Sequence, residues 1–302
     1  MRRAAVLLVL VVGVLAAAPA AHASFSHNPI LFVHGIEGTG AQFESQKMRF
    51  MSNGYPANWF DEVDYDSTRA VGDKTAVDQQ IDQAIAGLKR RTGKSKVDVV
   101  AHSLGTMVMY DYLTQGPQAA QRRANVGHYV NVDGQDQNPG VPTLALWAGR
   151  PLANARMLQG DRHMDGAKNV TIPNQTHVQT CTSKESFVQY YEFFTGKRPA
   201  HDLVPESGPI RISGKTLIFP QNVGALGATM ELWPVDARGR RAGSRPLYSR
   251  RITDGSQGGG GWGPVTVQAG KRYEFAVTTT SGTLHYYYEP FVRSDYTVRL
   301  LV

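Results

Sequence analysis

Hydrophobic positions follow two different periods in this chain. Through residue 194, short apolar runs alternate with longer segments in which apolar residues recur every three or four positions. The runs predict buried strands, and the longer segments predict amphipathic helices. Predicted strands cover 29–33, 59–65, 97–101, 128–132, 143–147 and 169–172, and predicted helices cover 41–53, 77–88, 104–114 and 183–194. Strands that alternate with helices indicate a doubly wound, mainly parallel sheet with helices on both faces, the α/β class.

The remainder of the chain has the period of a pleated sheet. After a polar stretch that begins at residue 195, apolar and polar residues alternate in short segments separated by Gly, Pro and Asp. This pattern is typical of a smaller, all-β antiparallel sandwich of about a hundred residues. We expect an α/β domain over 24–200, a linker over 201–208 and a β-sandwich domain over 209–302. The glycine run at 256–261 predicts a mobile loop within the sandwich.

The first residues have the pattern of a cleaved secretory signal peptide over 1–23. A basic start at Arg2 and Arg3 precedes an apolar run over 4–18 and an Ala-x-Ala site over 21–23. The run is short for a membrane span, and the Ala-x-Ala site has no role in an uncleaved anchor, which is the alternative interpretation. We expect a secreted, extracellular protein without stable membrane insertion after cleavage.

Composition and charge narrow the classes of partner. The 32 basic and 25 acidic residues give a net charge of +7 without a basic run interleaved with aromatics, so no nucleic-acid partner is expected. The single cysteine, Cys181, excludes an internal disulfide, and we expect it to pack in the core. The spacing of His, Cys, Asp and Glu does not make a metal-ligand set, and neither a metal nor an organic cofactor is expected.

Residues 97–106 carry the strongest chemical pattern. An apolar, β-branched run ends at Ala101 and is followed by Ser103 and a predicted helix. A serine hydroxyl is a poor nucleophile unless a turn exposes it, a base activates it and donors stabilise the oxyanion. The nucleophile elbow, Gly-x-Ser-x-Gly, supplies such a turn, and here Ala101 and Gly105 occupy its two small positions. Ser103 is therefore the predicted nucleophile, and a serine that caps an ordinary helix is the alternative.

An acid and a base should follow the serine in chain order, on loops at the carboxyl ends of strands. His177 comes five residues after the last predicted strand of the α/β domain and before its last helix, where the base is expected. Asp133 directly follows the strand at 128–132 and is the predicted acid. Asp136, farther into the same loop, and Asp161 remain alternatives.

A glycine-rich loop follows the first predicted strand. Its sequence from His34 to Gly40 has neither the Gly-Lys-Ser/Thr ending of a phosphate loop nor a dinucleotide-binding register. A His-Gly pair at this place suits the loop that donates one backbone N–H to the oxyanion. The predicted oxyanion donors are the backbone amides of Ile36 and Leu104. His102 is expected to point away from the nucleophile, as part of the scaffold.

Several segments resemble the small secreted lipases of bacilli, in the α/β-hydrolase superfamily. They are the loop at 34–38, the elbow at 101–105 with its shared alanine, and 165–170 leading to the base loop at 176–178. The chain is more closely similar to a two-domain archaeal lipase with a C-terminal β domain, over nearly all of the mature sequence. The resemblance implies Ser103 as nucleophile, Asp133 as acid and His177 as base, and a C-terminal domain that helps to form the acyl-chain pocket.

The sequence departs from the bacillus group at Arg150 and Pro151, where the acid of that group would fall, and this favours Asp133. The predicted function is that of a secreted serine esterase or lipase that acts on carboxylic esters through a Ser-His-Asp acyl-enzyme. Its expected partners are a lipid or other ester substrate and, transiently, a lipid surface. A polyester depolymerase, a short-chain carboxylesterase and a non-catalytic surface-binding protein are the alternatives.

Overall fold

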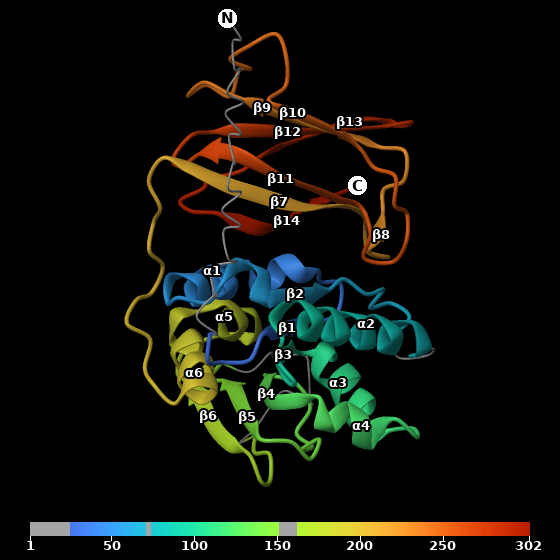
Figure 1. Cartoon of the computed structure of the whole chain (residues 1–302), viewed down its shortest axis with the longest axis vertical. Coiled ribbons are helices and arrows are strands. Elements are labelled where there is room, and N and C mark those ends of the chain that lie inside the picture. Colours follow the sequence, from blue (N-terminus) through green and yellow to red (C-terminus); the bar gives the residue numbers. More distant parts are fainter. Residues whose placement is uncertain (1–24, 71–73, 151–161) are drawn as a thin grey trace, which may run out of the picture.

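The structure is a computed structural model that describes residues 25–70, 74–150 and 162–302. The predicted signal peptide and Asp161 lie outside the described residues. A parallel sheet with flanking helices comes first along the chain, and two further sheets follow it (Figure 1). We refer to these parts as the α/β region and the β region.

The α/β region is built on six strands in the order β2-β1-β3-β4-β5-β6, and every neighbouring pair is parallel. The strands are β1 (Ile30–Val33), β2 (Phe60–Val63), β3 (Val97–His102), β4 (Val126–Val132), β5 (Thr143–Ala148) and β6 (Lys168–Ile172). The direction of strand addition reverses between β1 and β3, because β2 lies outside β1 while β4 to β6 follow β3. This arrangement confirms the predicted doubly wound α/β class.

Apolar residues on the two faces of the sheet pack against different helices. On β1, Leu31 and Val33 lie in one core and Ile30 and Phe32 in the other, as the two-residue period of a strand requires. Residues of α2 and α3 complete the first core, and residues of α1 and α6 complete the second. Burial of one such side chain contributes about 1.5–3 kcal/mol to the free energy of folding. Packing on both faces therefore stabilises the sheet and the positions of its strand ends. The helices are η1 (Gly40–Phe43), α1 (Glu44–Ser52), η2 (Ala57–Trp59), α2 (Thr75–Thr92), α3 (Leu104–Thr114), α4 (Ala119–Ala124), α5 (His177–Thr182) and α6 (Lys184–Thr195).

Helix α5 begins where the sequence predicts a loop. The Thr176 backbone N–H donates to Oε1 of Gln179 at 3.0 Å, and the Gln179 N–H donates to Oγ1 of Thr176 at 3.5 Å. This reciprocal pair is a capping box, which satisfies donors that the first turn of a helix leaves free. His177 is therefore fixed as the first residue of a helix.

Two four-stranded sheets form the β region around a core that includes Ile212, Leu232, Phe275 and Leu300. One sheet has the order β10-β9-β12-β13, and the other has β11-β7-β14 with β8 paired to β7. The strands are β7 (Pro209–Ile218), β8 (Val223–Gly224), β9 (Thr229–Pro234), β10 (Tyr248–Arg251), β11 (Gly261–Gln268), β12 (Tyr273–Thr279), β13 (Gly282–Tyr287) and β14 (Asp295–Leu301). The predicted all-β region is confirmed; most strand pairs are antiparallel, and β14 runs parallel to β7.

The β region lies against the side of the α/β region that carries α1 and β2 (Figure 1). Asp64, which follows β2, is fully buried between the two regions. Its Oδ2 lies 2.9 Å from Nη2 of Arg299 on β14 and 2.6 Å from Nζ of Lys215 on β7. A buried carboxylate requires such partners, so these ion pairs specify which surfaces of the two regions meet.

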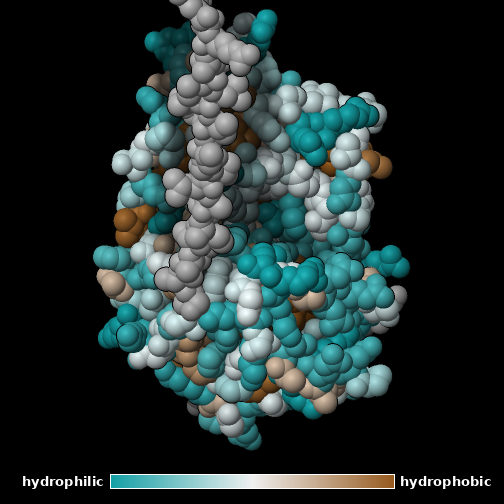
Figure 2. All heavy atoms as spheres, in the orientation of Figure 1, coloured by the Kyte–Doolittle hydropathy of each residue, from teal (hydrophilic) through white to brown (hydrophobic). Residues whose placement is uncertain are grey.

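The face of the molecule seen in Figure 2 is covered mainly by hydrophilic residues, with small and separate apolar areas. Most of the large apolar side chains of the described residues lie in the cores of the two regions. No described helix combines the length and the apolar character that crossing a membrane requires.

Candidate active site

The carboxyl ends of β1 and β3 lie side by side at the point where strand addition reverses. Val33 and Ala101 are partners in the parallel pairing of these strands. Doubly wound sheets bind their ligands in the crevice outside such a switch point. The loop after β1 brings Ile36 to this crevice, and the turn after β3 brings Ser103.

Ser103 occupies a strained turn between a buried strand and a helix. Its backbone has φ 53° and ψ −122°, a conformation that a residue with a side chain rarely adopts. Gly105 allows helix α3 to lie close to β1: a Cβ at this position would lie 2.4 Å from the carbonyl oxygen of His34. The elbow pattern in the sequence thus corresponds to a sharp strand-to-helix turn.

The predicted acid and base are in direct contact. Nδ1 of His177 lies 2.6 Å from Oδ2 of Asp133, and both side chains are buried. Asp133 comes directly after β4 and also has a positive φ, of 45°. A hydrogen bond from Nδ1 fixes the imidazole tautomer, so that Nε2 is the nitrogen available to accept a proton.

The second oxygen of the Asp133 carboxylate is held by two more donors. Oδ1 accepts from the backbone N–H of Ala148 at 2.9 Å and from Nη1 of Arg162 at 2.9 Å. Burial alone would raise the pKa of Asp133, but the bonds from His177 and Ala148 and the charge of Arg162 outweigh burial and lower it. Asp133 is therefore ionised wherever the protein is folded near neutral pH. The guanidinium of Arg162 is itself held over the ring of Trp147, at 4.2 Å from its centroid.

Ser103 is partly exposed, and its hydroxyl is the proposed reactive group. The hydroxyl forms no hydrogen bond with another described residue, and neither does Nε2 of His177. Hydrogen bonds between a nucleophile and its base are often long or poorly aligned before a substrate binds. The placement of the serine beside the His177–Asp133 pair follows from its elements: β3 and β4 are adjacent, and Ser103 N–H donates to the carbonyl of Val132 at 3.0 Å.

Two backbone amides near Ser103 have no acceptor among the described residues. On the loop after β1, Gly35 N–H donates to Gln42 Oε1 at 3.1 Å and Glu37 N–H donates to Ser67 Oγ at 2.8 Å. The N–H of Ile36, between them, has no such partner, and Leu104 N–H is one of the free donors at the start of α3. These two amides are the predicted oxyanion donors.

His102 connects the loop after β1 to the base. Its Nδ1 lies 2.6 Å from Nε2 of Gln42, and its Nε2 lies 3.1 Å from the carbonyl oxygen of His177. Burial, with a smaller effect from His177, lowers the pKa of His102 to about 3, so the ring is neutral. A neutral ring with its proton on Nε2 accepts from Gln42 and donates to the His177 carbonyl, which suits the predicted scaffold role.

The alternatives to Asp133 differ in position. Asp136 is exposed and has no contact with His177, and Asp161 lies outside the described residues. Gln42 and Arg162 were not predicted as site residues; their partners His102 and Asp133 are 60 and 29 residues away. No local pattern signals such contacts.

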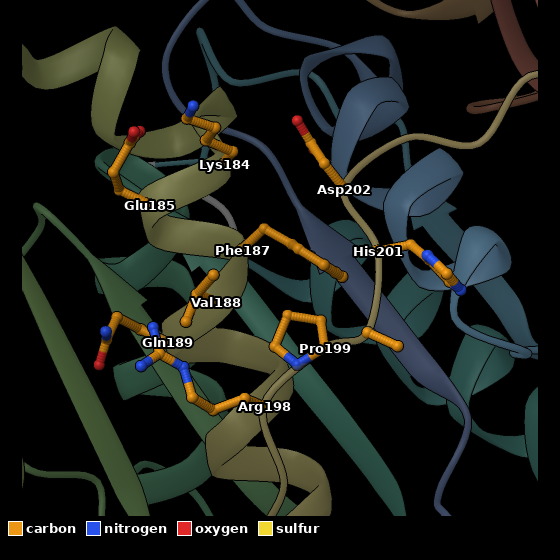
Figure 3. A pocket seen from close by; sticks show the side chains of 10 residues that line it. Lys184, Glu185, Phe187, Val188, Gln189, Arg198, Pro199, His201 and Asp202 are labelled. Carbon is orange, nitrogen blue, oxygen red and sulfur yellow. The ribbon is translucent and has the colours of Figure 1, made fainter.

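A cleft of about 410 Å³ lies away from these residues, between α6 and the segment after it. Figure 3 shows Phe187 and Val188 of α6 on one side of this cleft and Arg198 and Pro199 on the other, with the ring of His201 pointing away from α6. Ser103, Asp133 and His177 do not line it. Among the described residues, no group of three His, Cys, Asp or Glu side chains could hold a metal ion.

Comparison with known families gives two matches. Residues 27–136 match the model of class 2 lipases, and residues 208–302 match the model of the lipase C-terminal domain.

Solved structures of several hydrolases also share similarity with the chain. A lipase from Bacillus licheniformis in its mature form aligns with a TM-score of 0.44 at 12% identity, covering 59% of this chain and 96% of that one. Lipase B of Aspergillus fumigatus aligns with a TM-score of 0.42 at 13% identity, covering 61% and 56%. A carboxylesterase from Bacillus subtilis aligns with a TM-score of 0.39 at 10% identity, covering 58% and 86%. At these scores and identities, the similarity to lipases rests on the two sequence models.

Proposed function

We propose that this chain, an α/β-hydrolase lipase with a lipase C-terminal domain, cleaves carboxylic esters by way of an acyl-enzyme on Ser103. The matches to the two lipase models support an ester hydrolase, and the serine mechanism is the step that we add. The observation that carries this mechanism is the 2.6 Å contact between His177 Nδ1 and Asp133 Oδ2 beside the strained turn of Ser103.

In the first half-reaction, Oγ of Ser103 attacks the ester carbonyl carbon while Nε2 of His177 takes the hydroxyl proton. The amides of Ile36 and Leu104 bind the oxyanion, and one such donor typically accelerates an acyl transfer by about 10²–10³-fold. The tetrahedral intermediate then loses the alcohol, which receives its proton from His177. Water repeats the same steps on the acyl-enzyme, which releases the carboxylic acid and restores Ser103.

Exposed apolar side chains next to these residues support an apolar acyl group as substrate. Ile36 is 65% exposed, Met107 on α3 is 39% exposed, and Val178 next to the base is 59% exposed. Ile36 is itself a proposed oxyanion residue, and Met107 and Val178 follow Ser103 and His177 within four residues. Exposed apolar side chains favour contact with an apolar ligand. Turnover that rises from acetyl to octanoyl esters would agree with this; turnover of acetyl esters alone would indicate a short-chain carboxylesterase.

Export is a further part of the proposal, and it depends on the signal pattern over 1–23. Cleavage after Ala23 would release a protein that begins at Ser24 and acts outside the cell on lipid or other ester substrates. Sequencing the N-terminus of the exported protein tests this, and retention of residues 1–23 would contradict it.

The acid is tested by a matched pair of variants. Asp133→Asn removes the charge that holds the His177 tautomer, and we expect kcat for a nitrophenyl ester to fall by about 10⁴-fold. Asp136→Asn changes an exposed carboxylate three residues along the same loop, and we expect nearly full activity. A large loss in Asp136→Asn or in Asp161→Asn, with activity kept in Asp133→Asn, would show that another carboxylate is the acid.

A further inference from the structure

The loop after β1, residues 34–40, is held on several sides, and we call it the oxyanion loop. Within the α/β region, Gln42 binds the N–H of Gly35 and Ser67 binds the N–H of Glu37. Asp64 Oδ1 accepts from the N–H of Gly40 at 2.7 Å. These bonds leave the carbonyl of Gly38, at the middle of the loop, to be satisfied from elsewhere.

Its donor comes from the β region. Nδ2 of Asn222, in the turn between β7 and β8, lies 2.8 Å from the Gly38 carbonyl oxygen and 3.0 Å from that of Tyr65. The same nitrogen lies 3.4 Å from Nε2 of His34. Asn222 is completely buried at this contact, 184 residues away from Gly38 in sequence.

The Asn222 backbone is itself fixed. Its N–H donates to the carbonyl of Ile218 at 2.8 Å, and its carbonyl accepts from Gly258 N–H at 2.8 Å. In the glycine run at 256–261, for which the sequence predicts a mobile loop, Gln257 Nε2 also lies 3.2 Å from the carbonyl oxygen of Asp64 in the α/β region. A side chain on such a backbone can hold a loop in place.

The chemistry of this contact requires an amide. Two carbonyl oxygens need two N–H donors, and the terminal NH₂ of asparagine provides them from one atom. Oδ1 of Asn222 has no partner among the described residues, although leaving a buried acceptor unpaired is costly. The NH₂ group of Asn222 therefore binds the oxyanion loop, while its unpaired Oδ1 lowers the stability of the folded protein.

His34, beside this contact, is held in its neutral form. Burial lowers the pKa of His34 to about 4, so Nδ1–H donates to the Gly35 carbonyl at 2.7 Å. Nε2 then accepts from Tyr65 N–H at 3.3 Å, and the Tyr65 ring is stacked on the imidazole with centroids 4.2 Å apart. Asn222 therefore contacts both stacked residues, His34 and Tyr65, as well as the Gly38 carbonyl of the oxyanion loop.

We propose that Asn222 is a positioning residue of the reaction: from the C-terminal β region, it fixes the oxyanion loop so that Ile36 N–H points at the developing oxyanion. This inference rests on the proposed serine mechanism and deepens it. Asn222 is not the sole contact between the two regions, because Asp64 with Arg299 and Lys215 also forms buried ion pairs between them.

The test compares an oxygen ester with its thionoester in the full-length protein. Sulfur accepts hydrogen bonds more weakly than oxygen, so a well-placed oxyanion donor favours the oxygen ester. Asn222→Gly removes the side chain without straining the backbone, whose φ of 56° suits glycine. We expect kcat for the oxygen ester to fall by about ten- to a hundredfold with KM changed less than about twofold. The ratio of kcat/KM between the two esters should fall by a similar factor.

Ser52→Ala is the matched control. Ser52, on α1, accepts a hydrogen bond from Arg293 of the β region and one from Val204 N–H at 3.0 Å, and neither bond involves the oxyanion loop. Ser52→Ala removes contacts between the two regions, and we expect it to leave the ratio of kcat/KM between the oxygen ester and the thionoester unchanged.

Rates are expressed per active site titrated with a fluorophosphonate, so that loss of folded protein does not count as loss of turnover. Asn222→Asp, of the same shape, replaces the donor by an acceptor facing two carbonyl oxygens and should lower the ratio as well. An unchanged ratio in both Asn222 variants, or the same fall in Ser52→Ala, would overturn the inference. Full activity of Ser103→Ala would instead overturn the proposed mechanism, so the two failures are distinct.

Discussion

Gly105 shows how a single residue limits the geometry of the elbow. A Cβ at this position would lie 2.4 Å from the carbonyl oxygen of His34 and 2.6 Å from that of Val33. Both are backbone atoms, which cannot rotate away as the end of a side chain can. The requirement for glycine at this place is therefore steric, and it also sets the distance between Ser103 and the oxyanion loop.

Gly105→Ala should destabilise the protein and lower its activity together. Overpacking at such a contact typically costs about 1–3 kcal/mol, and the displaced His34 carbonyl begins the oxyanion loop. Gly87→Ala on α2 is the control, because the nearest atoms there are the ends of flexible side chains, the closest being Arg91 Nη1 at 3.4 Å. It should stabilise the helix by about 0.5–1 kcal/mol. Urea unfolding of both variants measures this, and a Gly105→Ala as stable as wild type would contradict the steric account.

The residues of the site differ in how far the sequence could predict them. Chain order and strand ends lead to Ser103, Asp133 and His177, because a doubly wound sheet brings the carboxyl ends of its strands to one edge. Nothing local points to Arg162 or Asn222, since their partners lie 29 and 184 residues away. Such contacts depend on how loops and regions pack, which periodicity does not encode.

At the scale of elements, α1 and β14 bring two carboxylates together. Burial, the charge of Asp295 and a hydrogen bond with Asp295 raise the pKa of Glu44, the first residue of α1, to about 8. Asp295 on β14 also has a raised pKa, chiefly from burial. Lys47 and Arg299 favour the charged form of Glu44 but do not outweigh these effects. The pair therefore shares a proton over much of the neutral range.

This pair predicts a pH-dependent stability. The pKa of Glu44 is higher in the folded than in the unfolded protein. The contribution of Glu44 to the free energy of unfolding is therefore fully present below about pH 4.3 and is lost as pH rises towards about 8. Glu44→Gln keeps the neutral form, so its Tm should exceed that of wild type by at least about 5 °C at pH 9 and equal it near pH 4.

Glu289→Gln is the control, because Glu289 is exposed in the segment after β13. The Tm of Glu289→Gln should equal that of wild type at both pH values. Thermal unfolding followed by circular dichroism measures all three proteins, and equal Tm values of Glu44→Gln and wild type at pH 9 would contradict the buried pair.

Helices and strands were predictable where apolar residues recur with a single period over the whole segment. Helix α3 begins and ends at the predicted residues, Leu104 and Thr114. Helix α5 was missed although its signal was present, since Thr176 and Gln179 have the spacing of a capping box. With only six residues, α5 is too short to show a helical period, and only its cap could have predicted it.

At the scale of the whole molecule, the proposed site draws on both regions. The α/β region supplies the proposed nucleophile, acid and base, which follow β3, β4 and β6. The β region meets it at Asp64 and reaches the oxyanion loop through Asn222. A change in the β region would thus alter turnover without altering the proposed catalytic residues. The alternation of apolar residues predicted this region, but not the surface by which it meets the sheet.

The most direct test of the central claim is covalent labelling of Ser103. The purified protein is treated with a fluorophosphonate, and the adduct is located by peptide mass spectrometry while nitrophenyl ester hydrolysis is followed. We predict one phosphonate per chain on Ser103, loss of hydrolysis in proportion to labelling, and neither label nor turnover in a Ser103→Ala variant that remains folded by circular dichroism. A label on another residue, or undiminished hydrolysis by Ser103→Ala, would contradict the proposed mechanism.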